Sequence, residues 1–271
     1  MDKIQSPIIL AAVKLATYVP LSIVSFVIVF RHGISRGDGW VLLSIFCITQ
    51  LVGGILYFLS FFSSYTSLDN GAYALEASGL SPLLLCTLGL LHSIFQTPDG
   101  FLRYQAYFRL LQLLGTVAFC LNFFSIYFVM IKGTTSNTNA MVLAGVILYA
   151  ILYIILVGIC LYLWTQIRFV MRYRKQLLKA VSVALPFLTV RTVYSVLFML
   201  WMDRNPGSTP LDLGEFDLIE GNWQIYIAMK MLMEYAVVII YSVAAFVLPL
   251  KKDYKIPESY QDEYLLSRPH C

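Results

Sequence analysis

Residues 140–164 read AMVLAGVILYAILYIILVGICLYLW, a stretch that contains no charged side chain. At 1.5 Å per residue, an α-helix of about 20 residues crosses the ~30 Å hydrocarbon core of a bilayer. Backbone groups in lipid must be hydrogen-bonded within their own segment, because no water reaches them. The stretch therefore predicts a membrane-spanning helix.

Six further stretches of the chain have the same character. With the first, they give predicted spans at residues 7–30, 40–62, 71–94, 110–131, 140–164, 178–201 and 223–248, followed by a short cytosolic tail at 249–271. Of the 271 residues, 59% are hydrophobic and 13% are charged, and the mean hydropathy is +0.76. Soluble domains carry about 25% charged residues. We therefore expect a single-domain, all-α polytopic membrane protein with a bundle of seven transmembrane helices.

The Lys and Arg residues are distributed unequally between the two ends of the predicted spans. Of the 19, thirteen lie on one side, three lie on the other and three lie inside spans. Loops rich in Lys and Arg stay in the cytosol, so we expect an exterior or lumenal N-terminus and a cytosolic C-terminus. The basic run at 168–179 is then a topology signal beside anionic headgroups, and no nucleic-acid partner is expected.

Five ionisable residues lie inside the predicted spans: Lys14, Glu76, Arg191, Lys230 and Glu234. Helix rise places all five ~8–16 Å below the exterior face. Charged side chains are costly in a bilayer and usually face a protein interior or a water-filled cavity. Five of them at similar depth predict one shared polar chamber in the exterior half of the membrane.

Each of these charges has a structural explanation beside a functional one. Lys230 and Glu234 are four residues apart and share a helix face, which favours a local salt bridge. The stem of Lys14 is long enough to reach the interface. Arg191 keeps its charge in proteins and needs an anion such as Glu76 or Glu234. Glu76 has no partner in its own span, so it either pairs across the bundle or stays protonated as a general acid.

Eight residues of the chamber are candidates for function. Those expected to take part in catalysis are Glu76, Glu234, Arg191 and Lys230. Those expected to bind a substrate are Tyr194, Gln50, Asn122 and Lys14. The sequence contains no DDxxD cluster, no Cys/His spacing typical of a metal site and no P-loop, GxSxG or HExxH motif. It therefore predicts proton-driven chemistry on an apolar molecule, without a metal or cofactor.

Several short stretches resemble a fungal family of seven-span membrane proteins. They are Phe30-Arg31-His32-Gly33 leading to Gly39-Trp40, Leu51-Val52-Gly53-Gly54, Gly79-Leu80-Ser81-Pro82-Leu83-Leu84-Leu85, and Leu185-Pro186-Phe187 through Arg191 and Tyr194. Some members look like the membrane-bound terpene cyclases of the ascofuranone type. The resemblance implies acid-triggered opening of a terminal epoxide on a prenylated aromatic compound in fungal secondary metabolism. The Asn-x-x-Trp-Glu stretch of the better-known meroterpenoid cyclases is absent, so the candidate residues rest on the charges alone.

The first functional hypothesis is a membrane-embedded meroterpenoid cyclase of the endoplasmic reticulum. Glu76 donates a proton to the epoxide, Arg191 and Lys230 tune the carboxyl groups, and Glu234 orients them or takes the proton back. The partners are then a prenylated aromatic epoxide and the lipid bilayer. The alternative is a non-enzymatic seven-span receptor or sensor, although the short cytosolic loops leave little surface for a signalling partner. A transporter is disfavoured by the odd number of spans and the lack of a repeat.

Overall fold

The computed structural model describes residues 2–32, 38–60, 75, 78–95, 102–132, 136–166, 172–203 and 227–248. Within these ranges the chain is helical and contains no strand. The helices are α1 (Asp2–His32), α2 (Asp38–Ser60), α4 (Leu80–Phe95), α5 (Leu102–Lys132), α6 (Ser136–Thr165), α7 (Arg172–Asp203) and α9 (Leu232–Val247). A π-helical segment, Ile227–Met231, leads directly into α9.

Six of these helical segments are long and apolar enough to cross a membrane, and they lie in α1, α2, α5, α6, α7 and the π segment with α9. The remaining helix, α4, is apolar but has 16 residues. The described part of the chain is therefore all-helical, and its long apolar helices are those of an integral membrane protein, as the sequence predicts. Of the predicted span 71–94, residues 71–74, 76 and 77 lie outside the described residues.

The helices extend beyond the apolar stretches that predict them. α5 begins at Leu102, ahead of the predicted span 110–131, and α7 begins at Arg172, ahead of 178–201. Hydrophobicity marks only the part of a helix that lies in hydrocarbon. Helical hydrogen bonding continues into the polar interface, so each helix is longer than the span that it contains.

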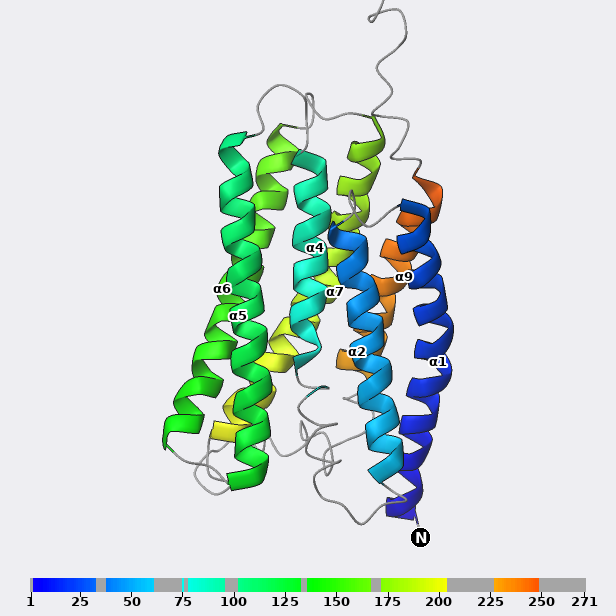
Figure 1. Ribbon diagram of the computed structural model, residues 1–271, viewed down its shortest axis with the longest axis vertical. Helices are drawn as coiled ribbons and strands as arrows, with labels where there is room; N and C mark the ends of the chain where they lie inside the picture. Colours follow the sequence, from blue (N-terminus) through cyan, green and yellow to red (C-terminus); the bar gives the residue numbers. More distant parts are fainter. Residues whose placement is uncertain are drawn as a thin grey trace, which may run out of the picture.

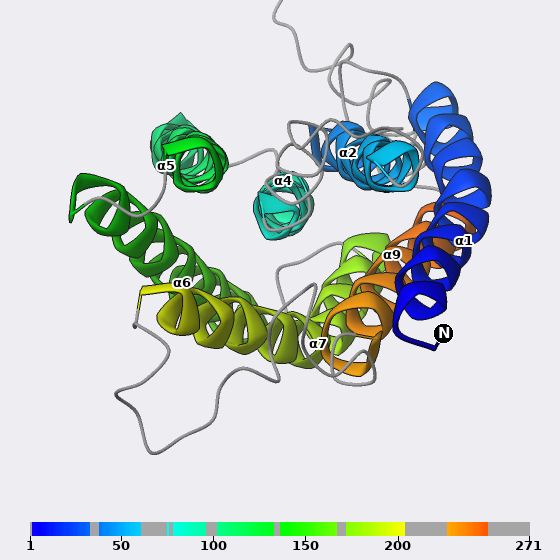
Figure 2. The same ribbon diagram turned by 90° about the horizontal axis from the view of Figure 1, so that it is seen from below.

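The helices form a bundle in which neighbours along the chain pack side by side (Figure 1). α1 packs on α2, α5 on α6, α6 on α7 and α7 on α9, and α9 returns to contact α1. Figure 2 shows α4 between α2 and α5, and α4 also contacts α6 and α7. Every residue from Leu80 to Leu91 is buried. α4 is thus the inner helix of the bundle, and its apolar side chains meet protein on all sides.

Two glycines allow neighbouring helices to approach α4 closely. A Cβ atom added at Gly39 of α2 would lie 2.8 Å from the backbone nitrogen of Leu90. One added at Gly115 of α5 would lie 2.5 Å from the Leu85 side chain. Small residues at such crossings are typical of membrane helices, where close packing drives association.

The outer surface of the bundle is apolar. Large side chains more than half exposed include Ile23, Phe30, Leu113, Ile154 and Val247. A surface of this kind is unfavourable in water but is solvated by acyl chains in a bilayer. By contrast, the charged side chains of Lys14, Arg191, Lys230 and Glu234 are buried inside the bundle, where they contribute to the candidate site.

Candidate functional site

An ion pair between Arg191 of α7 and Glu234 of α9 lies at the centre of the site. The Nε atom of Arg191 donates to Oε1 of Glu234 over 2.6 Å. Both side chains are 2% exposed, so the pair is enclosed by protein. Of the two carboxylates expected near Arg191, the structure places that of Glu234 beside it.

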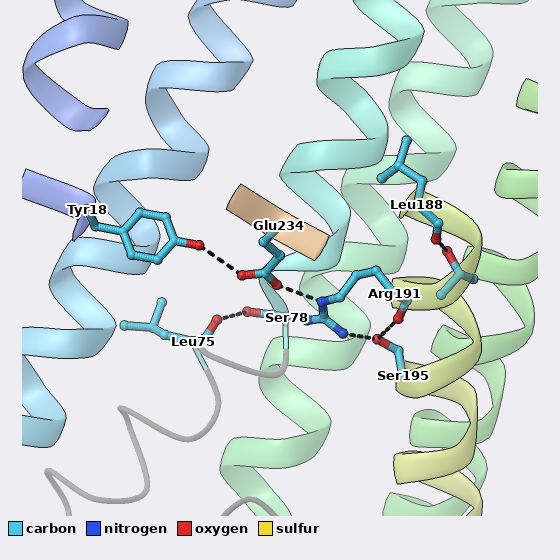
Figure 3. A network of polar contacts seen from close by, with 8 residues as sticks. Tyr18, Leu75, Ser78, Leu188, Arg191, Ser195 and Glu234 are labelled. Carbon is cyan, nitrogen blue, oxygen red and sulfur yellow. Dashed lines mark hydrogen bonds and ion pairs between the residues drawn. The ribbon is translucent and has the colours of Figure 1, made fainter. Parts of the chain in front are cut away.

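Two hydroxyl groups complete the network (Figure 3). Tyr18 of α1 donates to the second carboxylate oxygen, Oε2, over 3.0 Å. The Nη1 atom of Arg191 donates to Ser195, 2.5 Å away, and Ser195 donates to the backbone carbonyl of Arg191. Both carboxylate oxygens therefore accept a hydrogen bond. The network joins three helices that are far apart in the sequence.

The network is costly unless its groups are well paired. Removing two charges from water carries a penalty of several kcal/mol per ion, which the mutual attraction offsets only with good geometry and further hydrogen bonds. Glu234 has both, from Arg191 and Tyr18. Arg191 keeps its charge in proteins, so Glu234 faces a permanent cation. The geometry suits a fixed negative charge or a proton acceptor.

Aromatic side chains surround the Tyr18 end of the network. The Tyr18 ring centroid lies 5.0 Å from that of Tyr235 and 6.2 Å from that of Phe46. The Tyr235 hydroxyl is hydrogen-bonded to Thr17. On the other side, the Arg191 guanidinium lies 5.8 Å from the centre of the Tyr194 ring. Aromatic faces attract cations, so both ends of the ion pair have surroundings that favour positive charge.

The backbone that leads to Glu234 is irregular. The π-helical segment Ile227–Met231 precedes α9, and Glu234 lies in the first turn of that helix. Lys230, in the π segment, is 2% exposed. π-Helical turns are rare and occur often at functional sites. The widened turn therefore lies one turn away from the ion pair.

The two buried lysines lie at the same level of the bundle. α1 and α9 run in the same direction (Figure 1), and Tyr18 contacts Glu234. Lys14 precedes Tyr18 by one turn, and Lys230 precedes Glu234 by one turn. Lys14 is 7% exposed, and its Cδ lies 3.9 Å from the place of a Cβ at Gly54 of α2. Its side chain thus faces the bundle and does not extend along the lipid-facing surface.

The two mid-span amides, Gln50 and Asn122, are both buried, at 1% and 0% exposed. Neither amide atom of Gln50 has a hydrogen-bond partner in the described part of the chain. Asn122 donates to the carbonyl of Ala118 over 2.9 Å, while its Oδ1 has no partner there. Buried amides with unused bonding capacity are uncommon in folded proteins.

One predicted catalytic residue, Glu76, lies outside the described residues. Its neighbours Leu75 and Ser78 are described, and the buried Ser78 donates to the Leu75 carbonyl over 3.1 Å. The described residues contain no group of three or more His, Cys, Asp or Glu side chains that could hold a metal ion.

Sequence reasoning missed Tyr18 and Ser195. Both lie four residues after a buried charge, Tyr18 after Lys14 and Ser195 after Arg191. Residues four apart share a helix face, so a search for hydroxyls on the charged faces would have found both.

Comparison with known proteins identifies the family of this chain. A family model described as "Domain of unknown function (DUF7702)" matches residues 7–252. No curated protein and no solved structure gives a significant match. The family match covers the described helices from residue 7 of α1 to the end of α9, and with them the whole candidate site. The chain therefore belongs to the DUF7702 family.

Proposed function

We propose that the protein is a membrane-embedded terpenoid cyclase that opens an epoxidised prenyl chain and closes it into a ring. The supporting observation is the Tyr18–Glu234–Arg191 network, an enclosed carboxylate beside aromatic rings inside a lipid-facing bundle. A fixed negative charge in a low-dielectric site stabilises positive charge that develops in a reacting molecule. The resemblance to membrane-bound terpene cyclases supports the same chemistry.

The proposal includes a topology. The predicted span 71–94, which includes most of α4, is the third of seven, and the excess of Lys and Arg on one side favours a lumenal N-terminus and a cytosolic tail at 249–271. The membrane is that of the endoplasmic reticulum. The Arg191–Glu234 pair then lies in the lumenal half of the bilayer. A lipophilic substrate reaches such a site sideways from the membrane.

In the proposed reaction, the residues divide the proton transfers between them. Glu76 protonates the epoxide oxygen as the C–O bond breaks, which leaves a hydroxyl group and a tertiary carbocation. An alkene or hydroxyl of the substrate captures the cation, and the proton lost at the end passes to Glu234. Arg191 and Lys230 set the positions and charges of the carboxyl groups. Proton transfer by positioned groups contributes about 10²–10⁴ in rate, and the fixed charges supply more.

The test is conversion of an epoxidised prenyl phenol by microsomes that contain the chain. Wild-type microsomes should give a cyclic product, and Glu76→Gln and Glu234→Gln should each lower the rate by about 100-fold or more. Glu258→Gln, in the predicted cytosolic tail, is the matched control and should keep full activity. If both active-site variants form product as fast as the wild type, the assigned roles are wrong. A wild-type chain that converts none of the epoxides offered would favour a receptor or sensor.

A further inference from the structure

A second group of buried polar side chains lies on helices that do not contribute to the ion pair. It consists of Ser81 of α4, Asn122 of α5 and Tyr149 of α6, which are 0%, 0% and 3% exposed. Gly145 of α6 faces the Asn122 amide, and Tyr149 follows Gly145 by one turn, so Tyr149 lies on the same helix face. The side chains of Ser81, Asn122 and Arg191 are near enough to influence its hydroxyl. The cluster therefore adjoins the candidate site from the side of α4, α5 and α6.

The hydrogen bonds that are present fix what each group can still accept or donate. Asn122 donates through Nδ2 to the Ala118 carbonyl. A carbonyl only accepts, so the amide nitrogen must face it, and Oδ1 is left as an acceptor. Ser81 donates its proton to the Gly115 carbonyl over 3.0 Å, so its hydroxyl oxygen has only acceptor capacity left.

Three atoms around this cluster have no hydrogen-bond partner among the described residues. They are Oδ1 of Asn122, the hydroxyl of Tyr149 and Nη2 of Arg191. In folded proteins nearly all buried polar atoms are paired, and exceptions often mark the place of a water or a ligand. The unpaired set contains an acceptor, a donor and a hydroxyl that does either. A single O–H group placed among them would pair at least two.

The packing holds Asn122 in position. Gly145 of α6 faces its amide so closely that an added Cβ would lie 2.3 Å from Nδ2. The bare backbone of α6 thus forms one wall of the cluster, and the hydrogen bond to Ala118 fixes the amide on α5. A preorganised acceptor of this kind loses little freedom when it binds a ligand.

We propose that Asn122 and Tyr149 form a subsite for the hydroxyl group of a lipophilic phenol or alcohol. Asn122 Oδ1 accepts the hydroxyl proton, and Tyr149 donates to the hydroxyl oxygen. The subsite rests on the proposed function only for the lipophilic character of its ligand. The subsite adds the requirement that the ligand carry a hydroxyl group. In the proposed arrangement Arg191 lies between this hydroxyl and the Glu234 carboxylate.

The experiment measures binding to the purified full-length chain in detergent micelles. The two probes are a farnesylated phenol and farnesylbenzene, which lacks only the hydroxyl. Wild type should bind the phenol about tenfold more tightly, because an unpaired buried acceptor then gains its partner. Asn122→Ala and Tyr149→Phe should each reduce this preference to about threefold or less. Tyr162→Phe, at an exposed position of the same helix, should preserve it.

The preference is the ratio of the affinities of one variant for the two probes. A variant that is only less stable loses affinity for both probes, so this ratio does not change. Equal binding of both probes by wild type, or no binding of either, overturns the subsite; equal binding means that a water occupies it. A preference that Asn122→Ala and Tyr149→Phe leave unchanged also overturns it and leaves these residues a structural role. Hydroxyl-selective binding without conversion of any epoxide contradicts only the proposed cyclase activity. Conversion without selectivity contradicts only the subsite.

Discussion

The two halves of the bundle join their helices by different means. In one half, α1, α7 and α9 meet through the charged network of Tyr18, Arg191 and Glu234. In the other, ~10 Å further along α9, α4 and α9 meet through two neutral hydroxyls. Thr87 donates to the Leu83 carbonyl, and its oxygen is 2.8 Å from the Tyr241 hydroxyl. All these side chains are buried.

The neutral contact shows that this bundle can link its helices without a buried charge. Replacement of a buried ion pair by neutral groups is often tolerated or stabilising in proteins. If the ion pair only holds α7 against α9, a neutral pair should replace it without loss of function. We interpret the ion pair as a feature retained for chemistry, and the variants below test that distinction.

The largest effect is expected from Arg191→Met, which leaves the Glu234 carboxylate without its ion-pair partner. Breaking a buried pair on one side costs about 3–5 kcal/mol of stability. The free energy of unfolding, measured by titration with a denaturing detergent, should fall by that amount. The double variant Arg191→Met with Glu234→Gln should recover at least half of the loss, yet show no cyclase activity. If Arg191→Met alone leaves the free energy of unfolding unchanged, Glu234 does not depend on Arg191.

An intermediate effect is expected from Tyr18→Phe, which removes a hydrogen bond to a charged acceptor. Such bonds contribute about 1.5–3 kcal/mol. Tyr241→Phe is the matched control in the neutral half and should cost about 0.5–1.5 kcal/mol, since Thr87 keeps its bond to Leu83. Only Tyr18→Phe should lower the cyclisation rate. Equal losses of stability and activity from both substitutions would remove the distinction between the two halves.

The smallest effect is expected from a pair of glycine substitutions on α6. Gly145→Ala forces a methyl group against the Asn122 amide, and overpacking of this kind costs about 1–3 kcal/mol. Gly158→Ala meets nothing within 4 Å, so the unfolding midpoint should stay the same or rise slightly. If the two substitutions have equal effects, Asn122 is free to move and the subsite is not preorganised.

Much of the architecture is predictable from composition and length. Six apolar stretches correspond to long helices, because the thickness of hydrocarbon sets a minimum length for any span. The enclosed position of α4 was not predictable. Its run Leu83-Leu84-Leu85 is as apolar as a lipid-facing helix, and hydrophobicity does not distinguish protein neighbours from lipid neighbours.

The candidate site was predictable in part. The burial of Lys14, Arg191, Lys230 and Glu234 agrees with the expectation that membrane charges face the interior. The sequence predicts that Arg191 has a carboxylate partner. That this partner is Glu234 depends on how α7 lies against α9. Tyr149 gave no signal, because a buried tyrosine in an apolar span reads as packing until its neighbours are known. The π segment before Glu234 was equally hidden.

Glu234 takes its described partners from α1 and α7, although it stands on α9, the last of the described helices. Ribosomes deliver these helices to the membrane one after another, so α1 and α7 are inserted before α9 arrives. During that interval the guanidinium of Arg191 lacks the carboxylate that later compensates it. Synthesis of α9 is therefore the step that allows the site to assemble, and no shortened chain that ends before residue 234 can carry the network.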